Sequence, residues 1–357
     1  MNTKEIIFLI LSFVVAFVFS FAATPLSYRL AFKIGAVDVP KDSRRMHKKP
    51  IPRLGGLAIV FGFLVSICCF GQMTRELAAM LVGAAIIFVM GMVDDCKNLN
   101  AKLKFVIQII AALVVVIGGN IRIVAMTNPN IFSDNPYLVL PWWLSGIATI
   151  LWIVFITNAV NFIDGLDGLA AGVSAIMSVS LVFVAVRMGN YSVAIIGLAL
   201  MGACFGFLPF NFNPAKIFMG DTGSTFLGFI LATLSVQGVF KSYAIISFAV
   251  PLLILGLPLF DALFAMIRRI YHGQSPMSAD RGHLHHRLID MGFSQKQTVF
   301  ILYAISAVLG ITAVLLAEYG TIRALILLIA VLAFVVLNGV VHKNPLTEGE
   351  EDEKDDK

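Results

Sequence analysis

The chain has 357 residues, of which 59% are hydrophobic and 13% are charged, and its formal net charge at pH 7 is +5. This composition excludes a soluble globular domain, because it supplies far more apolar side chains than a core of this size needs. The four cysteines show neither metal-ligand spacing nor a disulfide framework. We therefore expect the chain to sit in a lipid bilayer and to have no nucleic-acid partner.

Eleven apolar runs are candidate membrane spans. They lie near residues 6–31, 54–70, 77–93, 105–124, 142–162, 169–187, 192–210, 222–238, 243–267, 298–316 and 321–341. The runs lack the alternation of a barrel, and lipid admits only helices or closed barrels. A basic cluster follows the first run, which favours a retained helix over a signal peptide. The sequence predicts an all-α polytopic membrane domain over 1–341 and an acidic cytoplasmic tail over 342–357, expected to be disordered.

The placement of lysine and arginine predicts the orientation. Positive charges concentrate in alternate connections, at 33–53, 94–104, 211–221 and 268–297. The opposite connections carry few. We therefore expect the N-terminus outside and the C-terminus in the cytoplasm, with Trp142 and Trp143 at the outer interface.

That orientation brings every unusual polar segment to the cytoplasmic side. The segments lie at 47–56, 94–95, 158–168, 211–224 and 279–287. A topology wrong by one span would divide them between the two faces of the bilayer. Their agreement supports a single cytoplasmic site.

The segment 158–168 places Asn158, Asn161, Asp164 and Asp167 in an otherwise lipid-like stretch. A carboxylate at the bilayer centre costs roughly 2.5–3.5 kcal/mol, so such groups mark a site, a pathway or an ion. Their three-residue spacing is near enough to the helical period to share one face. Asn161, Asp164 and Asp167, together with Asp221, form a set of hard oxygen donors that suits Mg²⁺. Hydrogen bonding between helices is the structural alternative.

Asp94 and Asp95 end the third apolar run. An acidic pair at a helix boundary is often only a cap for the next helix. Adjacent carboxylates also position a phosphate-bound cation or accept a proton. The sequence leaves both roles open.

Histidines and arginines cluster in one cytoplasmic loop, as Arg281, His283, His285, His286 and Arg287. No cysteine and no helical zinc motif accompanies them, which argues against a transition-metal site. A cationic, hydrogen-bond-donating loop that holds a diphosphate is the better interpretation.

Asp261 lies seven residues before Arg268 in a largely apolar run. A charge within a membrane segment usually finds a partner of opposite sign. We expect these two residues to form a structural intramembrane ion pair.

Acidic metal ligands, basic phosphate holders and access to lipid imply one substrate from water and one from the membrane. Phosphoryl transfer onto a lipid acceptor fits this description. An ion-coupled transporter is the alternative from another class, because buried carboxylates also serve transporters. A transporter needs access from both faces, and the outer connections are almost devoid of polar groups.

Two motifs are highly specific: Asn158-Ala-Val-Asn-Phe-Ile-Asp-Gly-Leu-Asp-Gly-Leu-Ala and Phe218-Met-Gly-Asp-Thr-Gly-Ser. At these residues the chain resembles the bacterial polyprenyl-phosphate N-acetylhexosamine-1-phosphate transferases, over roughly 25–300. The loop Asp280-Arg-Gly-His-Leu-His-His-Arg-Leu is similar to the WecA/TagO branch, which uses UDP-GlcNAc. The phospho-MurNAc-pentapeptide translocase branch has a proline-led triple histidine instead, which is absent here.

The resemblance implies roles for the matching residues. Asn161 and Asp221 would hold Mg²⁺, or Mn²⁺ in its place, on the nucleotide diphosphate. Phe218 would stack on uracil. Asn211 and Asp167 would contact the nucleoside, with Asp164 in the same pocket.

It also implies how the lipid phosphate and the sugar are bound. Asp94 and Asp95 would position or deprotonate the lipid phosphate, and Lys104 follows them where the family has a basic residue. The loop that closes over sugar and diphosphate would comprise Arg281, His283, His285 and His286. Lys49 and Arg53 are further substrate-binding positions.

The implied reaction converts UDP-GlcNAc and undecaprenyl phosphate into undecaprenyl-diphospho-GlcNAc and UMP, the first membrane step of an envelope polysaccharide such as teichoic acid or O-antigen. Direct attack by the lipid phosphate is favoured over an aspartyl-phosphate on Asp94 or Asp95. The expected setting is a multi-pass protein of the bacterial plasma membrane, and a homodimer is compatible with it. Transfer of phospho-MurNAc-pentapeptide is the alternative within the family.

Overall fold

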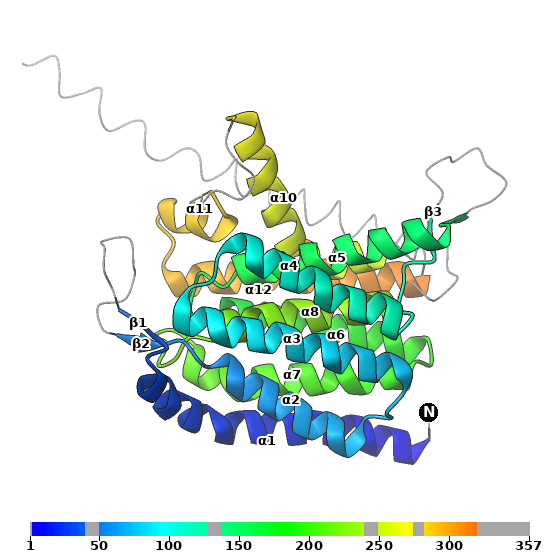
Figure 1. Cartoon of the computed structure of the whole chain (residues 1–357), viewed down its shortest axis with the longest axis horizontal. Helices are drawn as coiled ribbons and strands as arrows, with labels where there is room; N and C mark the ends of the chain where they lie inside the picture. The colour runs from blue at the N-terminus through cyan, green and yellow to red at the C-terminus, as the bar shows by residue number, and fades with distance from the viewer. Residues whose placement is uncertain (1, 40–49, 128–136, 239–248, 274–281, 320–357) are drawn as a thin grey trace, which may run out of the picture.

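The computed structural model describes residues 2–39, 50–127, 137–238, 249–273 and 282–319, and over these it is a bundle of long helices (Figure 1). Seven helical segments in this part of the chain are long and apolar enough to cross a membrane. They are α1 (Thr3–Ile34), α3 (Arg75–Lys97), α4 (Ala101–Leu113) with its π-helical continuation η1 (Val114–Gly118), α5 (Trp142–Phe162), α6 (Leu169–Arg187), α7 (Tyr191–Asn211) and α12 (Gln295–Tyr319). The prediction of an all-α, multi-pass membrane protein is confirmed. The number eleven and the orientation stay predictions.

The remaining described elements are shorter or more deeply buried. The helices are α2 (Gly56–Phe70), α8 (Gly220–Gly238), α9 (Ala249–Ile254), α10 (Gly256–Tyr271) and α11 (Leu284–Asp290). Two antiparallel hairpins, absent from the prediction, pair β1 (Val37–Asp38) with β2 (Ile51–Pro52) and β3 (Ala125–Thr127) with β4 (Tyr137–Val139). Each hairpin lies in a connection between helices and leaves the bundle all-α.

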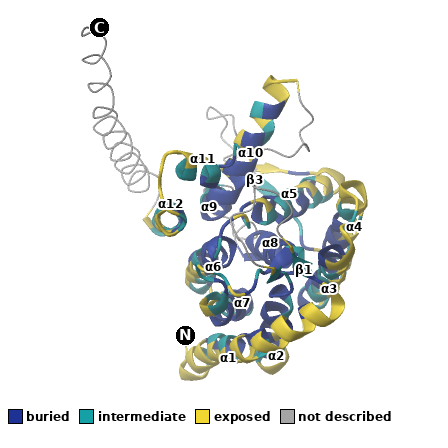
Figure 2. Ribbon diagram, turned by 90° about the vertical axis from the view of Figure 1, so that its left-hand side faces the viewer, coloured by how far each residue is buried: buried dark blue, intermediate teal, exposed yellow. Residues whose placement is uncertain are grey.

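Helix α8 forms the centre of the bundle, and all of it except Asp221 is buried (Figure 2). Glycines let neighbouring backbones approach it: a Cβ at Gly228 would lie 2.8 Å from the Cα of Thr157, and one at Gly91 would lie 2.6 Å from the Cα of Thr222. The indole of Trp152 donates to the hydroxyl of Ser235 at 3.0 Å. This packing fixes the position of the α8 N-terminus.

Helix α1 shows why the bundle belongs in lipid. Its buried face consists mainly of small residues, including Ser12, Ala16, Ser20 and Thr24, and packs against α7 and α2. Many of its large apolar residues, such as Ile10 and Leu26, are exposed, and α1 forms an exposed edge of the bundle in Figure 2. Small residues inside and large apolar residues outside are the pattern of membrane helices, because lipid solvates the large side chains.

The predicted span over 243–267 is described from Ala249 onward, where it consists of two helices, α9 and α10. The helix is interrupted at Leu255, between α9 and α10, and α10 projects from the bundle (Figure 1). Pro258 in the first turn of α10 lacks a backbone N–H and suits a helix that starts anew. The predicted span 321–341 and the tail 342–357 lie outside the described residues.

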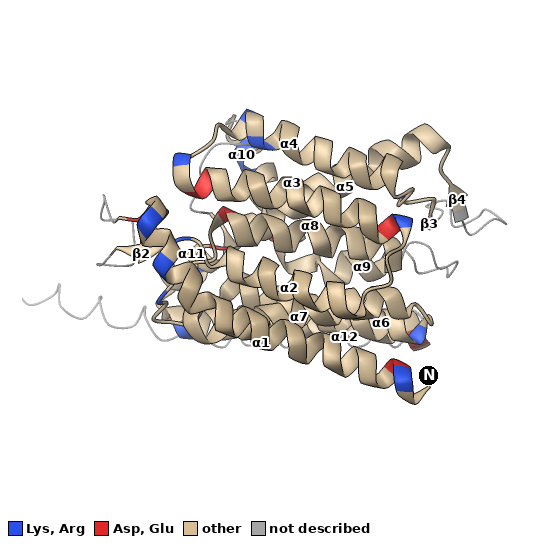
Figure 3. Cartoon of the chain, turned by 60° about the horizontal axis from the view of Figure 1, so that its bottom comes forward, with Lys and Arg blue, Asp and Glu red and all other residues tan. Residues whose placement is uncertain are grey.

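Antiparallel packing of successive helices brings one set of helix ends together. The C-terminal ends of α3, α5 and α7 meet the N-terminal ends of α4, α6, α8 and α12, beside β2 and α11 (Figure 1). Charged residues gather at the ends of the bundle and leave its middle almost free of charge (Figure 3). The predicted convergence of the polar segments at one side of the membrane domain is thus observed for the described residues.

Candidate active site

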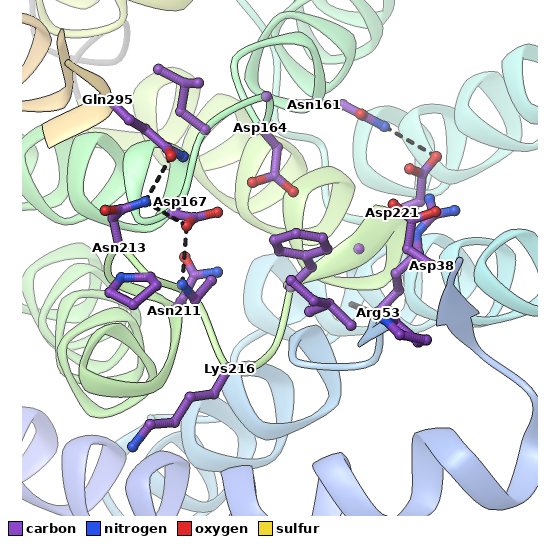
Figure 4. A pocket seen from close by; sticks show the side chains of 18 of the residues that line it. Asp38, Arg53, Asn161, Asp164, Asp167, Asn211, Asn213, Lys216, Asp221 and Gln295 are labelled. Atoms are coloured by element: carbon purple, nitrogen blue, oxygen red, sulfur yellow. Dashed lines mark hydrogen bonds between the residues drawn. The ribbon is translucent and has the colours of Figure 1, made fainter. Parts of the chain in front are cut away.

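A cavity of about 800 Å³ opens at this end of the bundle (Figure 4). The predicted site residues that line it are Arg53, Asn161, Asp164, Asp167, Asn211, Phe218, Asp221 and His286. They come from α5, α7, α8, α11 and from connections, including the one that follows β2. Segments more than 200 positions apart in the sequence therefore form a single wall. Lys49 and Arg281 lie outside the described residues.

A lysine links two acidic residues at the edge of this cavity. The ammonium of Lys104 lies 2.8 Å from Oδ2 of Asp221 and 3.1 Å from Oδ2 of Asp94. The side-chain amide of Asn161 donates to the same Asp221 oxygen at 3.2 Å. The ends of α4 and α5 are thus tied to the carboxylate of Asp221. The positive charge of Lys104 compensates two negative charges that burial would otherwise penalise.

Asp95 is occupied by the start of α8. Its Oδ1 accepts from the backbone N–H of Asp221 at 2.9 Å, and its Oδ2 accepts from the N–H of Thr222 at 2.9 Å and from the hydroxyl of Thr222. The guanidinium of Arg53 lies 3.6 Å from Oδ1. Gly220 precedes this turn with φ of 68°, and any side chain there would overlap the Asp95 carboxylate. Asp95 therefore caps α8, a helix remote in sequence, and orients Asp221.

Asp94 has fewer fixed partners. Its Oδ1 accepts from the N–H of Leu99 at 2.6 Å, and its Oδ2 faces Lys104. Both aspartates are buried. Asp95 therefore serves as a cap, whereas Asp94 faces the ammonium of Lys104.

Asp167 and Asn211 hold the walls of the cavity together. Oδ2 of Asp167 accepts from the side chain of Asn213 at 2.9 Å and from the N–H of Ala215 at 3.0 Å. Asn211 accepts from the N–H of Gly168 at 3.1 Å and donates to the carbonyl of Ile217 at 2.9 Å. These bonds clamp the connection after α5 to the connection after α7, which carries Phe218.

Phe218 enters the cavity from a rigid backbone. Its N–H donates to the carbonyl of Pro52 at 2.8 Å, and its carbonyl accepts from the N–H of Gly55 at 2.9 Å. A Cβ at Gly55 would lie 2.7 Å from that carbonyl, so only glycine permits the approach. The aromatic ring is therefore held at a defined place in the wall.

Asp164 and Asn158 separate in role. Figure 4 shows the carboxyl group of Asp164 pointing into the cavity. Burial, reinforced by the negative charges of Asp221 and Asp95, raises the pKa of Asp164 to about 8. Asn158 instead exchanges hydrogen bonds with Gln108 of α4, at 2.6 and 3.3 Å, in the interior of the bundle. Asn158 thus links α5 to α4 through side-chain hydrogen bonds.

The three histidines occupy different environments. His286 lines the cavity, whereas His283 and His285 are buried. The ring of His285 packs on Gly165, where a Cβ would lie 2.5 Å from its Nε2. Burial and the neighbouring His286 lower the pKa of His285 to about 4, so this ring is neutral at pH 7. The predicted role of this loop in holding a diphosphate stays a prediction.

The predicted ion pair between Asp261 and Arg268 is wrong, because the two side chains have separate partners in the histidine loop. Oδ2 of Asp261 lies 2.9 Å from Nδ1 of His283, and its Oδ1 accepts from the N–H of Leu284 at 2.7 Å. Arg268 donates to the carbonyl of Gly282 at 2.9 Å. Seven residues separate Asp261 and Arg268 by almost two helical turns, so each reaches the histidine loop independently.

Four residues of the cavity wall with polar side chains were not among the predicted site residues: Asp38, Asn213, Lys216 and Gln295. Asn213 and Lys216 lie inside a segment that was singled out, so a closer inspection could have included them. Gln295 accepts from Asn213 at 2.6 Å, but it starts a helix after an unremarkable loop. Asp38 belongs to a hairpin that was not predicted.

The donor set favours a cation that needs few protein ligands. Within the described ranges, no group of three His, Cys, Asp or Glu side chains could hold a metal ion. Asn161 and Asp221 offer oxygen donors at the cavity wall, which fits Mg²⁺ bound chiefly through phosphate oxygens.

Comparison with known proteins gives consistent matches. Residues 77–239 match the family model described as glycosyl transferase family 4. The chain is 39% identical over 339 residues to a Bacillus subtilis (strain 168) protein named "Probable undecaprenyl-phosphate N-acetylglucosaminyl 1-phosphate transferase", covering 94% of this chain and 92% of that one.

Two further relatives cover most of the chain. A Mycobacterium leprae (strain TN) protein named "Decaprenyl-phosphate N-acetylglucosaminephosphotransferase" is 36% identical over 317 residues, covering 81% of this chain and 78% of its own length. The Escherichia coli (strain K12) "Undecaprenyl-phosphate alpha-N-acetylglucosaminyl 1-phosphate transferase" is 28% identical over 296 residues, covering 82% and 79%.

Proposed function

The chain belongs to glycosyl transferase family 4, and we propose that it transfers N-acetylglucosamine 1-phosphate from UDP-GlcNAc to undecaprenyl phosphate, releasing UMP. The observation that carries this proposal is the contact of Lys104 with Asp94 and with Asp221, which lines a polar cavity at the end of a membrane-helix bundle. Such a centre serves a phosphorylated donor from water and a phosphorylated lipid from the bilayer. The names of the relatives support undecaprenyl phosphate and a donor of N-acetylglucosamine 1-phosphate as substrates.

The cavity wall suits a uridine diphosphate sugar. Phe218 offers an aromatic face for the base. Arg53 and Lys216 supply positive charge to a diphosphate, and His286 adds a ring nitrogen. Asp167 and Asn211 serve the nucleoside by fixing the shape of the wall, because their hydrogen bonds hold the two connections that form it.

Asn161 and Asp221 are the residues that would hold Mg²⁺. When bound, the ion would neutralise negative charge on the diphosphate. Lys104 contributes positive charge at the same carboxylate, and Asp95 holds the N–H groups of Asp221 and Thr222, so the direction of the Asp221 side chain is preorganised.

In the proposed reaction, an oxygen of the lipid phosphate attacks the β-phosphorus of UDP-GlcNAc. The bond between the β-phosphorus and the bridging oxygen breaks, and UMP leaves with the electron pair. Lys104 orients the attacking phosphate, and Asp94 accepts any proton that this phosphate still carries. We favour Asp94 over Asp95 for this role, because three hydrogen bonds from α8 already occupy Asp95.

Two wider features belong to the proposal. The protein lies in the plasma membrane of a bacterium, and the cavity opens toward the cytoplasm. This orientation is supported by the basic connections, which lie at the same end of the bundle as the cavity. The product then starts an envelope polysaccharide whose identity later enzymes decide.

The test is UMP release by the purified full-length protein with Mg²⁺, undecaprenyl phosphate and separate UDP-sugars. UDP-GlcNAc should release UMP, and UDP-MurNAc-pentapeptide should not. Release only from the pentapeptide substrate would favour the other transferase, and no release from any UDP-HexNAc would overturn the assignment. If the protein became radiolabelled by the donor in the absence of lipid phosphate, the direct attack would be wrong and a two-step route through an aspartyl-phosphate would be favoured.

A further inference from the structure

Asp261 on α10 is a buried carboxylate that does not line the cavity, yet it contacts the loop that does. Its two oxygens have separate partners, Nδ1 of His283 at 2.9 Å and the N–H of Leu284 at 2.7 Å. The side chains of Asp261 and His283 are 7% and 9% exposed, so water competes little for this bond. A buried pair of this kind fixes the orientation of the ring.

The histidine loop is held between two parts of the molecule. On one side, two residues of α10 form hydrogen bonds with its backbone: Asp261 accepts from the N–H of Leu284, and the guanidinium of Arg268 donates to the carbonyl of Gly282. On the other side, the rings rest on the connection after α5. His283 lies 5.9 Å from the Phe162 ring, and His285 packs on Gly165.

Ring contacts carry this placement to the cavity. His283 and His285 stack with centroids 5.8 Å apart and planes within 9°, and His285 lies 4.2 Å from His286. His286 lines the cavity. The rings of His283, His285 and His286 therefore form a row from the carboxylate of Asp261 to the cavity wall.

We propose that Asp261 is a positioning residue for the transfer reaction: it holds His283 with the proton on Nδ1 and caps the first turn of α11, which places His286 at the cavity wall. This inference rests on the proposed function. Helix α10, which does not line the cavity, would then help to position the loop that binds the sugar and diphosphate of the donor.

The tautomer follows from the chemistry of the carboxylate. An ionised Asp261 only accepts hydrogen bonds, so Nδ1 of His283 must be the protonated nitrogen. Asp261→Asn alters one of the two bonds. The amide oxygen still accepts from Leu284, but the amide NH₂ then faces Nδ1, which must accept and carries no proton. The variant keeps the volume of the side chain and changes the tautomer.

The experiment combines nitrogen spectroscopy with kinetics on the full-length protein in lipid nanodiscs. Only six histidines are present, so ¹⁵N-histidine NMR resolves them, and His283→Gln assigns the His283 signals. The wild type should show His283 protonated at Nδ1. Asp261→Asn should move the proton to Nε2 and lower kcat for UMP release roughly tenfold to 100-fold, with the KM for undecaprenyl phosphate changed less than twofold.

Two controls separate positioning from loss of structure. Asp290→Asn removes an exposed carboxylate from α11 and should leave kcat and the His283 signal unchanged. Asp261→Glu retains the carboxylate and should restore the Nδ1 proton and part of kcat.

The outcomes distinguish this inference from the function on which it rests. A wild-type His283 protonated only at Nε2 would overturn the inference even if Asp261→Asn fails to fold. An Asp261→Asn enzyme as active as Asp290→Asn would also overturn it. If the wild type released no UMP at all, the proposed function would fall, and the role in transfer would fall with it.

Discussion

The ammonium of Lys104 lies 2.8 Å from the carboxylate of Asp221, although 117 positions separate the two residues. Lys104 sits in the first turn of α4, and Asp221 sits in the first turn of α8. The packing of α3 against both helices brings these two starts together. The contact is thus a product of the whole bundle, and it joins the lipid-phosphate side of the proposed site to its nucleotide side.

Replacing Lys104 by methionine should lower kcat for UMP release by about 100-fold or more, because the site loses a preorganised positive charge beside two carboxylates. Methionine preserves most of the apolar stem, so packing of α4 is retained. Lys102→Met is the matched control, since Lys102 is exposed on the same helix turn and should retain full activity. Equal activity of the two variants would remove Lys104 from the mechanism. Initial rates of UMP release measure both.

Asp94 and Asp95 should differ when each is changed to asparagine. Asp95→Asn turns an NH₂ group toward the N–H donors of α8, so we expect a loss of roughly 1–3 kcal/mol in the free energy of unfolding together with lost activity. Asp94→Asn should lower kcat and leave the thermal unfolding midpoint nearly unchanged. Thermal unfolding in detergent and UMP release test this division. Equal destabilisation by both substitutions would contradict it.

The raised pKa of Asp164 makes the free protein sensitive to pH. An unfolded aspartate ionises near pH 4, whereas the folded one keeps its proton to about pH 8. Folding therefore favours the protonated form, and this contribution to stability is lost as the pH rises toward and through 8. His285 does not contribute in the window from pH 7 to 9, because it is neutral in both states there.

Asp164→Asn should remove most of the fall in the unfolding midpoint between pH 7 and 9 that the wild type shows without nucleotide or divalent cation. The amide matches the neutral carboxyl group in size and cannot ionise. Tryptophan fluorescence during heating measures the midpoint. Parallel curves for wild type and variant would show that Asp164 does not titrate in this window.

Much of the site was predictable because membrane sequences penalise unneeded polarity. Asn161, Asp164 and Asp221 stand out against apolar neighbours, and the alternation of helices brings them to one end. Their separate partners were not predictable. The exchange of hydrogen bonds between Asn158 and Gln108, and the capping of α8 by Asp95, depend on how helices rotate against one another. Spacing within one segment carries no information on that rotation.

The same limit explains why the sequence predicted neither the helix break before α10 nor the partner of Asp261. A hydropathy run does not reveal that Leu255 interrupts the helix, and helical periodicity does not show which neighbour Asp261 faces. The hairpin strands are two or three residues long, too short for any alternating pattern. For this reason the sequence did not predict that Asp38, in β1, lines the cavity.

Removal of divalent cations should abolish turnover if Asn161 and Asp221 hold Mg²⁺. Chelation by EDTA is expected to stop UMP release, and excess Mg²⁺, or Mn²⁺ in its place, should restore it. Asp221→Asn keeps the size of the side chain but removes its charge, so both the ion and Lys104 lose a partner. We expect at least a 100-fold lower kcat, with the protein still folded by its unfolding midpoint. The control Asp290→Asn should keep the wild-type dependence on Mg²⁺. Full activity in EDTA, or in Asp221→Asn, would mean that Lys104 and the basic wall stabilise the diphosphate without a metal ion.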